Sequence, residues 1–187
     1  MERHNCSLCS GVNRRNLMRL AGISVFASSA FNHSEAAAVS CPKRPGDESY
    51  MRLALDEAKK GDFPFGAVIV RNGQVAAVGR NTGIKSNDPT AHGEIAAIHD
   101  FLSRNASIEL KGTTIYTTGE PCPMCMGAII WCGFGRMVYG ASIKQLSTRI
   151  GQIMITSSTI ADAARENKIE ITGGVLGSEA LALFDRA

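Results

Sequence analysis

Residues 113–131 read TTIYTTGEPCPMCMGAIIW and residues 87–98 read NDPTAHGEIAAI. The run TTIYTT is rich in β-branched residues and predicts a strand over residues 113–118. The run PMCMGAIIW predicts a helix over residues 123–131, because proline is tolerated at the first position of a helix. The second stretch predicts another helix over residues 91–104, with Thr90 as its N-cap. A strand that connects two helices allows the sheet to bring both helix starts together.

Helical and strand patterns alternate on both sides of this block. A helix is expected over residues 47–60, and Asn72-Gly73 is a two-residue hairpin signal between strands at 65–71 and 74–81. The remaining expected elements are strands at 136–140, 152–155 and 169–171, short helical pieces within 142–167, and a closing helix at 177–184. This order predicts an α/β fold, a three-layer α/β/α sandwich with a mixed central sheet of about five strands.

Four side chains at the two predicted helix starts suggest a metal centre. His92 and Glu94 open one helix, and Cys122 and Cys125 open the other. The unpaired N–H groups of a helix start favour thiolate over thiol. Two thiolates and one imidazole would give zinc three protein ligands and leave its fourth position open, which is the catalytic pattern. His92 and Glu94 converge only if they occupy the irregular first turn of their helix, and we expect that they do.

Other interpretations of the same residues exist. A Cys-x-x-Cys pair is often a redox pair, and a single histidine is often a buried core residue. A structural zinc site would need a fourth protein ligand, for which Cys132 and His99 are the nearest candidates.

Composition excludes several classes of protein. A chain that is 44% hydrophobic and 20% charged fits a globular domain and not a disordered one. After Val39 the chain carries 16 basic and 15 acidic residues, unlike a protein that grips a long stretch of phosphate backbone. Nucleic acid is therefore not expected as a partner. Six cysteines in 187 residues are too sparse for a disulfide framework, and the sequence assigns no role to Cys41 or Cys132.

Residues 1–38 differ from the rest and predict an export signal. Arg14 and Arg15 precede a short apolar run over residues 20–31, and three alanines end the segment as a cleavage pattern. The arginine pair resembles a twin-arginine signal. Residues 39–187 then form the mature domain, periplasmic or secreted, with no stable membrane association after the signal is removed. If Met18 is the true start, the protein would be cytoplasmic.

The blocks FPFGAVIV, NDPTAHGEIAAI, TTIYTTGEPCPMCMGAIIW and GRMVYGA resemble the cytidine/deoxycytidylate deaminase superfamily over residues 47–184. The branch it is most similar to contains guanine, guanosine and tRNA adenosine deaminases. The resemblance implies one Zn²⁺ per chain held by His92, Cys122 and Cys125. It implies that Glu94 takes a proton from the attacking water and returns protons to a ring nitrogen and to the departing amine.

The resemblance also implies further contacts of the base. Asn81 matches the family asparagine that hydrogen-bonds the base, although it could simply cap a turn. Phe65 and Trp131 resemble aromatic pocket walls, and core residues would look the same in sequence. Family members usually have alanine at the position of Gly93, and they are commonly homodimers.

The substrate indications disagree. Trp131 and the loop at residues 86–90 favour guanine deaminases, but residues 150–155 (IGQIMI) lack the aspartate with which bacterial guanine deaminases bind the purine edge. The ending EITGGVLGSEALALF resembles tRNA adenosine deaminases. We expect a hydrolytic deaminase of a small-molecule nucleobase or nucleoside, guanine first. The alternatives are a tRNA adenosine deaminase and a non-catalytic zinc or thiol-redox protein.

Overall fold

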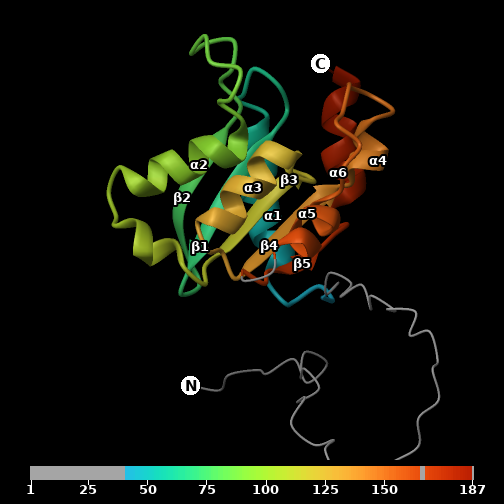
Figure 1. The fold of residues 1–187 in the computed structure, drawn as a ribbon. Helices are drawn as coiled ribbons and strands as arrows, with labels where there is room; N and C mark the ends of the chain where they lie inside the picture. Colours follow the sequence, from blue (N-terminus) through green and yellow to red (C-terminus); the bar gives the residue numbers. More distant parts are fainter. Residues whose placement is uncertain (1–40, 165–166, 187) are drawn as a thin grey trace, which may run out of the picture. The chain divides into compact units, whose positions relative to one another are not determined.

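One mixed sheet organises the computed structural model, which describes residues 41–164 and 167–186 (Figure 1). Its strands lie in the order β2-β1-β3-β4-β5; β1 is antiparallel to β2 and β3, whereas β3, β4 and β5 are mutually parallel. The strands are β1 (Gly66–Arg71), β2 (Gln74–Arg80), β3 (Thr114–Gly119), β4 (Arg136–Ala141) and β5 (Glu170–Thr172). The helices are α1 (Asp47–Ala58), α2 (Gly93–Leu102), α3 (Pro123–Trp131), α4 (Ile143–Leu146), α5 (Ser157–Ala163) and α6 (Gly177–Ala182), with 3-10 turns η2 (Ser107–Leu110) and η3 (Leu183–Arg186).

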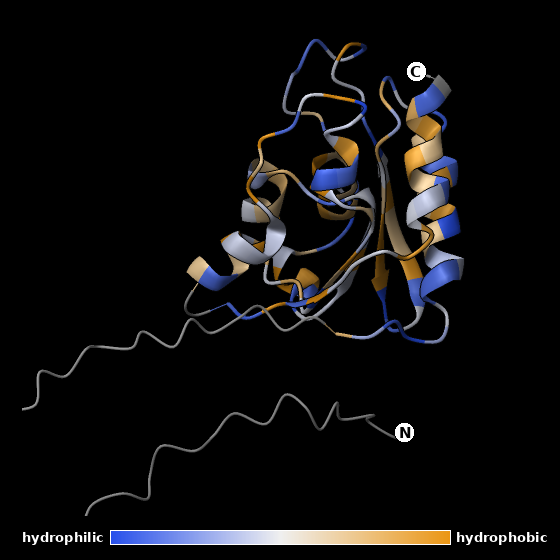
Figure 2. Cartoon of the chain, turned by 90° about the vertical axis from the view of Figure 1, so that its right-hand side faces the viewer, coloured by the Kyte–Doolittle hydropathy of each residue, from blue (hydrophilic) through white to orange (hydrophobic). Residues whose placement is uncertain are grey.

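Both faces of the sheet are buried, because apolar side chains of successive strand residues point to opposite sides. In β1, Ala67 and Ile69 belong to a core shared with α2 and α3, whereas Val68 and Val70 belong to a core shared with α1 and α6. Figure 2 views the sheet between its two helical layers. The predicted three-layer α/β/α sandwich is confirmed.

Close contact between helices and sheet is possible because small residues lie where they cross. A Cβ atom on Gly66 would lie 2.2 Å from the carbonyl oxygen of Ala54 in α1. One on Gly79 would lie 2.2 Å from the carbonyl oxygen of Gly93, at the start of α2. The backbone of α2 therefore rests directly on β2, and this contact fixes where its first turn lies.

The prediction of a strand over residues 152–155 is wrong. This segment is irregular, and Ile153, Met154 and Ile155 are exposed by 61%, 60% and 44%. An apolar run suggested a buried strand, but these side chains lie on the surface. The predicted closing helix is divided into α6 and η3.

The predicted export signal, residues 1–38, lies outside the described residues. Within residues 41–164 and 167–186, no helix combines the length and apolar character that crossing a bilayer requires.

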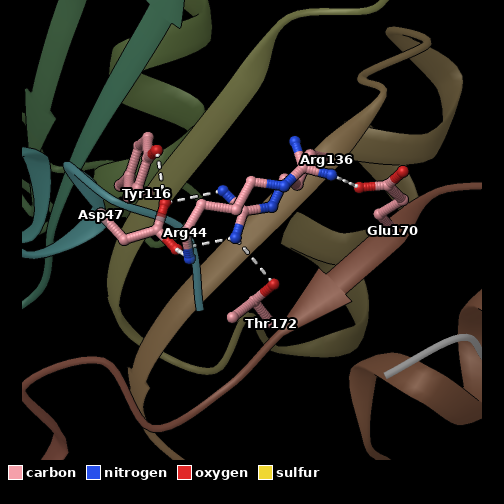
Figure 3. Close-up of polar contacts among 6 residues, drawn as sticks. All are labelled: Arg44, Asp47, Tyr116, Arg136, Glu170 and Thr172. Carbon is pink, nitrogen blue, oxygen red and sulfur yellow. Dashed lines mark hydrogen bonds and ion pairs between the residues drawn. The ribbon is translucent and has the colours of Figure 1, made fainter. Parts of the chain in front are cut away.

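A buried ion pair joins α1 to three strands (Figure 3). Both oxygens of Asp47, the first residue of α1, accept hydrogen bonds from Arg136 of β4, at 2.7 and 2.8 Å. The Tyr116 hydroxyl of β3 donates to Asp47 at 2.9 Å, and Arg136 donates to the Thr172 hydroxyl of β5 at 2.9 Å. Burial opposes ionisation of Asp47, yet the hydrogen bonds from Arg136 hold its pKa below the ordinary value.

We predict that Asp47→Asn lowers the free energy of unfolding by about 3–5 kcal/mol, because it leaves the Arg136 guanidinium buried without its counter-charge. Asp56→Asn is the control, since its ion pair with Lys59 is exposed and should contribute little. Denaturant unfolding at pH 7 measures both. The lowered pKa of Asp47 means that its contribution is present above pH 3.8 and is lost as the pH falls through the folded-state value. Equal unfolding midpoints for the two variants at pH 7 would contradict a stabilising role of the buried ion pair between Asp47 and Arg136.

Candidate active site

One edge of the sheet collects the residues that the sequence suggested. Because β1 is antiparallel to β2 and β3, the amino end of β1 and the carboxyl ends of β2 and β3 lie at this edge. Phe65 directly precedes β1, Asn81 directly follows β2, and Glu120 and Cys122 follow β3. Strand direction alone therefore brings together residues from distant parts of the chain.

Two helices begin at this edge with their metal ligands outside the regular helix. His92 is the N-cap of α2 and Cys122 is the N-cap of α3, both with extended backbone (φ −70°, ψ 160° and φ −64°, ψ 167°). Glu94 is the second residue of α2, so His92 precedes the helix with extended backbone, whereas the expectation was that both residues occupy an irregular first turn. The predicted cap Thr90 is wrong; it lies in the preceding loop, where its hydroxyl donates to Asp88 at 2.6 Å.

The three ligand atoms have the spacing of a zinc site. Nδ1 of His92 lies 3.5 Å from Sγ of Cys125 and 3.7 Å from Sγ of Cys122. Tetrahedral zinc with ordinary Zn–N and Zn–S bonds places nitrogen and sulfur about 3.6 Å apart. In the part of the chain that the structure describes, these residues are the one such group of metal-ligand side chains. The donor set and its spacing therefore fit the zinc ion that the sequence predicted.

Neither alternative fourth ligand is close. His99 lies in the last turn of α2, about 10 Å along the helix from His92. Cys132 is the C-cap of α3, about 15 Å along that helix from Cys122. Three protein ligands leave one tetrahedral position, which is the arrangement of a catalytic and not a structural zinc.

The two thiols are electrostatically unequal without a metal. A hydrogen bond from the Cys125 thiol, together with His92, lowers the pKa of Cys122 to about 4. The same hydrogen bond and burial raise the pKa of Cys125. The hydrogen bond with Cys122 raises the pKa of His92. One thiolate is thus already favoured at the helix start, and zinc binding would replace the proton of the other.

Glu94 provides a carboxyl group beside the ligands. Its side chain is buried, and burial raises its pKa to about 7 in the metal-free chain. A bound cation would favour the ionised form. A buried carboxyl group beside the metal ligands is placed to accept and return protons, as general acid–base chemistry requires.

A pocket with a cavity volume of about 540 Å³ opens over this centre, within the range of roughly 300–1,000 Å³ typical of small-molecule sites. Asn81 and Phe65 line it, and their contact with a base stays a prediction. Oδ1 of Asn81 accepts the N–H of Gly83 at 3.1 Å, which leaves Nδ2 of that amide able to donate to a ligand. The lining residues are Phe63, Phe65, Asn81, Gly83, Ile84, Asn87, Pro89, His92, Glu94, Glu120, Cys122, Ile150, Gly151, Gln152 and Ile153.

Trp131 does not line this pocket, and its predicted role as a wall residue is corrected. It is the last residue of α3, about 13 Å along the helix from Cys122, and its side chain is 85% exposed. The sequence pattern could not show that the ring points away from the core.

Two features of the site were missed or explained differently from the sequence. Glu120 lines the pocket, and its place in GEPC, two residues before Cys122, was the available signal. The glycine at position 93 is explained by the close approach of α2 to the segment before β1 and not by backbone freedom, because a Cβ atom there would lie 2.8 Å from the carbonyl oxygen of Phe65.

We predict that Cys125→Ser lowers the zinc content of the purified protein from one ion per chain to a small fraction, because it removes a thiolate ligand. Cys132→Ser is the matched control and should retain the full zinc content. Elemental analysis after gel filtration measures both. Loss of zinc in the Cys132 variant would instead support a four-ligand structural site.

Comparison with known proteins adds the family. The model of the cytidine and deoxycytidylate deaminase zinc-binding region matches residues 44–141. The tRNA-specific adenosine deaminase of Haemophilus influenzae is 37% identical over 138 residues, 71% of this chain and 78% of that protein. The guanine deaminase of Bacillus subtilis is 46% identical over 99 residues, 50% of this chain and 64% of that protein.

The length of the relatives varies widely. This chain spans 9% of the chloroplastic tRNA(adenine(34)) deaminase of Arabidopsis thaliana, to which it is 42% identical over 116 residues, 60% of its own length. The solved guanine deaminase of Nitrosomonas europaea superposes with a TM-score of 0.65 at 23% identity, covering 80% of this chain and 85% of that one, and supports the fold. A zinc-ligand triad with family spacing and a family model over half the chain agree: the chain belongs to the cytidine and deoxycytidylate deaminase family.

Proposed function

We propose that the protein is a zinc-dependent hydrolytic deaminase of a free nucleobase or nucleoside, with guanine as the first candidate. The observation that carries this proposal is the chemistry of the pocket lining, which includes no lysine or arginine among the residues that the structure describes. A phosphate group in the pocket would lack the cations that usually bind it. A flat, uncharged ring fits apolar walls with a few polar groups.

The residues of the chain have separate tasks in this reaction. When bound, zinc supplies Lewis-acid activation of water at its open position. Glu94 accepts the proton of the attacking water and returns protons to a ring nitrogen and to the leaving amine. Asn81 orients the base through Nδ2, and Phe65 covers a ring face. The buried position of Glu94 keeps bulk water away from the proton that it holds.

Guanine is favoured because its O6 and N7 atoms are acceptors for the Nδ2 donor of Asn81. The guanine deaminase of Bacillus subtilis, 46% identical over the matched region, supports the same choice. Adenosine also offers N7, so a tRNA adenosine substrate is the second candidate, favoured by the 37% identity to the Haemophilus influenzae enzyme.

We predict that Glu94→Gln lowers ammonia release by about 10²- to 10⁴-fold, because the amide cannot exchange protons with water or substrate. The zinc content should remain at one ion per chain. Glu179→Gln, an exposed carboxylate on α6, is the control and should keep its activity. The assay is ammonia release from guanine, guanosine, cytosine, adenosine and their analogues by the zinc-loaded protein. No release from any of these compounds would contradict the proposal.

A tRNA anticodon stem-loop belongs in the same assay. Inosine formation that weakens steeply with salt would favour the second candidate. We also propose that the twin-arginine leader exports the protein, and cell fractionation tests this location. A periplasmic protein would have no access to tRNA, which supports a free base as the substrate. If the protein is cytoplasmic, its location does not distinguish between the two substrates.

We further propose that the protein is a homodimer in which α3 faces a second copy. Met124 and Trp131, seven residues apart on one side of this helix, are exposed by 39% and 85%. Between them, a Cβ atom on Gly127 would meet nothing within 4 Å, so the helix surface is open there. A second copy would cover a large aromatic side chain that is otherwise in water.

We predict that Trp131→Lys weakens this dimer by tenfold or more, since a buried tryptophan is a frequent hot spot of interfaces. Leu53→Lys is the control, because Leu53 is 43% exposed on α1, which packs against the opposite face of the sheet from α3. Sedimentation velocity over a concentration series measures the association. A wild-type protein that stays monomeric, or a Trp131 variant with unchanged association, would contradict the proposed interface.

A further inference from the structure

Glu120 connects the zinc-ligand segment to two other helix starts. Its side chain is buried, and the residue lies two positions before Cys122. One carboxylate oxygen accepts the backbone N–H of Ile143, the first residue of α4, at 2.8 Å. The other accepts the backbone N–H of Ser157, the first residue of α5, at 2.9 Å. Each of these N–H groups lacks a partner within its own helix.

The segment between these anchors forms one wall of the pocket. Residues 150–153 line the cavity, and Ile153 and Met154 are largely exposed. In the described part of the chain, residues 151–155 make one backbone hydrogen bond, from the N–H of Ile155 to the carbonyl of Ile153, which is local. The position of this wall therefore depends on how its two ends are held.

At the first end, Ile150 donates its N–H to the Leu146 carbonyl at 3.0 Å and packs against the core beside α1 and α6, so Glu120 holds this end through α4. The remaining contacts at the two ends are weaker or join the same segments. The ion pair of Arg149 with Asp185 is exposed and therefore contributes little. The Ser157 hydroxyl donates to the carbonyl of Pro121 at 3.3 Å, again joining α5 to the segment before Cys122. Leu146 is buried and fixes α4, but it lies four residues before the wall.

The carboxylate has no cation to justify its burial. Among the described residues, Glu120 accepts hydrogen bonds from these two backbone N–H groups and from no lysine, arginine or histidine. Burying a charge is costly unless hydrogen bonds offset the loss of water. A carboxylate has two acceptor oxygens, so it can accept a hydrogen bond from each of two separate segments. A neutral amide has one acceptor oxygen and cannot do this in the same way.

We propose that Glu120 is a positioning residue that holds the pocket wall at residues 150–153 in register with the zinc-ligand helix α3. The wall and the metal half of the site then move as one unit. The effect on substrate binding rests on the proposed function, whereas the effect on the wall itself does not. Glu120 would determine how tightly the ring is enclosed without taking part in proton transfer.

The first test is Glu120→Gln, with Glu179→Gln as the control. The amide has one acceptor oxygen and a donor NH₂ group, so one of the two anchors is lost in either orientation. We expect hydrogen–deuterium exchange in residues 147–157 to rise about tenfold or more, with exchange in α2 and α3 unchanged and zinc at one ion per chain. With a substrate from the panel, KM should rise more than kcat falls, because Glu94 and the zinc ligands keep their places.

A second pair separates the anchor from a general loss of stability. Ser157→Pro removes the N–H that Glu120 accepts, at a first helical position where proline is tolerated. Ser157→Ala keeps that N–H and removes the hydroxyl alone. We expect faster exchange in residues 147–156 for the proline variant than for the alanine variant.

Exchange and zinc content need no substrate, so they decide this proposal even if the substrate panel finds no activity. Unchanged exchange in Glu120→Gln would overturn it, as would equal exchange in the two Ser157 variants. Loss of zinc together with faster exchange throughout the domain would also overturn it, since Glu120 would then support the whole fold and not the wall.

Discussion

The meeting of two helix starts is the constraint on which the site depends. The three metal-ligand residues belong to α2 and α3, and two of them lie just outside a regular helix, where backbone N–H groups are unpaired. This meeting also brings the Cys125 thiol and His92 to Cys122, and their hydrogen bonds lower the pKa of Cys122. It also requires α2 to approach the sheet closely, which Gly79 and Gly93 permit. A side chain at Gly79 would meet the backbone of α2 at 2.2 Å and push this helix, and with it His92 and Glu94, away from the cysteines.

The ends of the sheet have different roles. The buried pair of Asp47 with Arg136 joins α1 to the strands near the amino end of β4, whereas the zinc-ligand segment follows the carboxyl end of β3. The buried ion pair that stabilises the fold and the residues of the candidate active site therefore lie at opposite ends of the parallel strands. This separation allows the pocket edge to carry irregular backbone and exposed apolar residues, such as Ile84 and Ile153, without loss of the core.

Most of the helices and strands and the zinc ligands could be predicted from the sequence, because their sequence patterns are local and periodic. The strand and helix around GEPCPMC and the ligands His92, Cys122 and Cys125 follow from residue type and spacing. Other features depend on tertiary context. In the run at residues 152–155, Gln152 and Ile153 line the pocket and Met154 and Ile155 are exposed, and the sequence cannot distinguish such a run from a buried strand. Trp131 in an apolar helix looks like a core residue until the direction of its side chain is known. The partners of Glu120 lie 23 and 37 residues away, so no local pattern could indicate them.

The coordination of the metal is the most direct test of the central claim, that this is a three-ligand catalytic zinc site and not a structural one. X-ray absorption at the zinc edge of the purified, zinc-loaded protein reports the number and kind of ligand atoms. The geometry predicts two sulfur atoms, one imidazole nitrogen and one further light atom from water. A third sulfur, a second imidazole, or zinc bound elsewhere with Cys122 and Cys125 oxidised to a disulfide would contradict it.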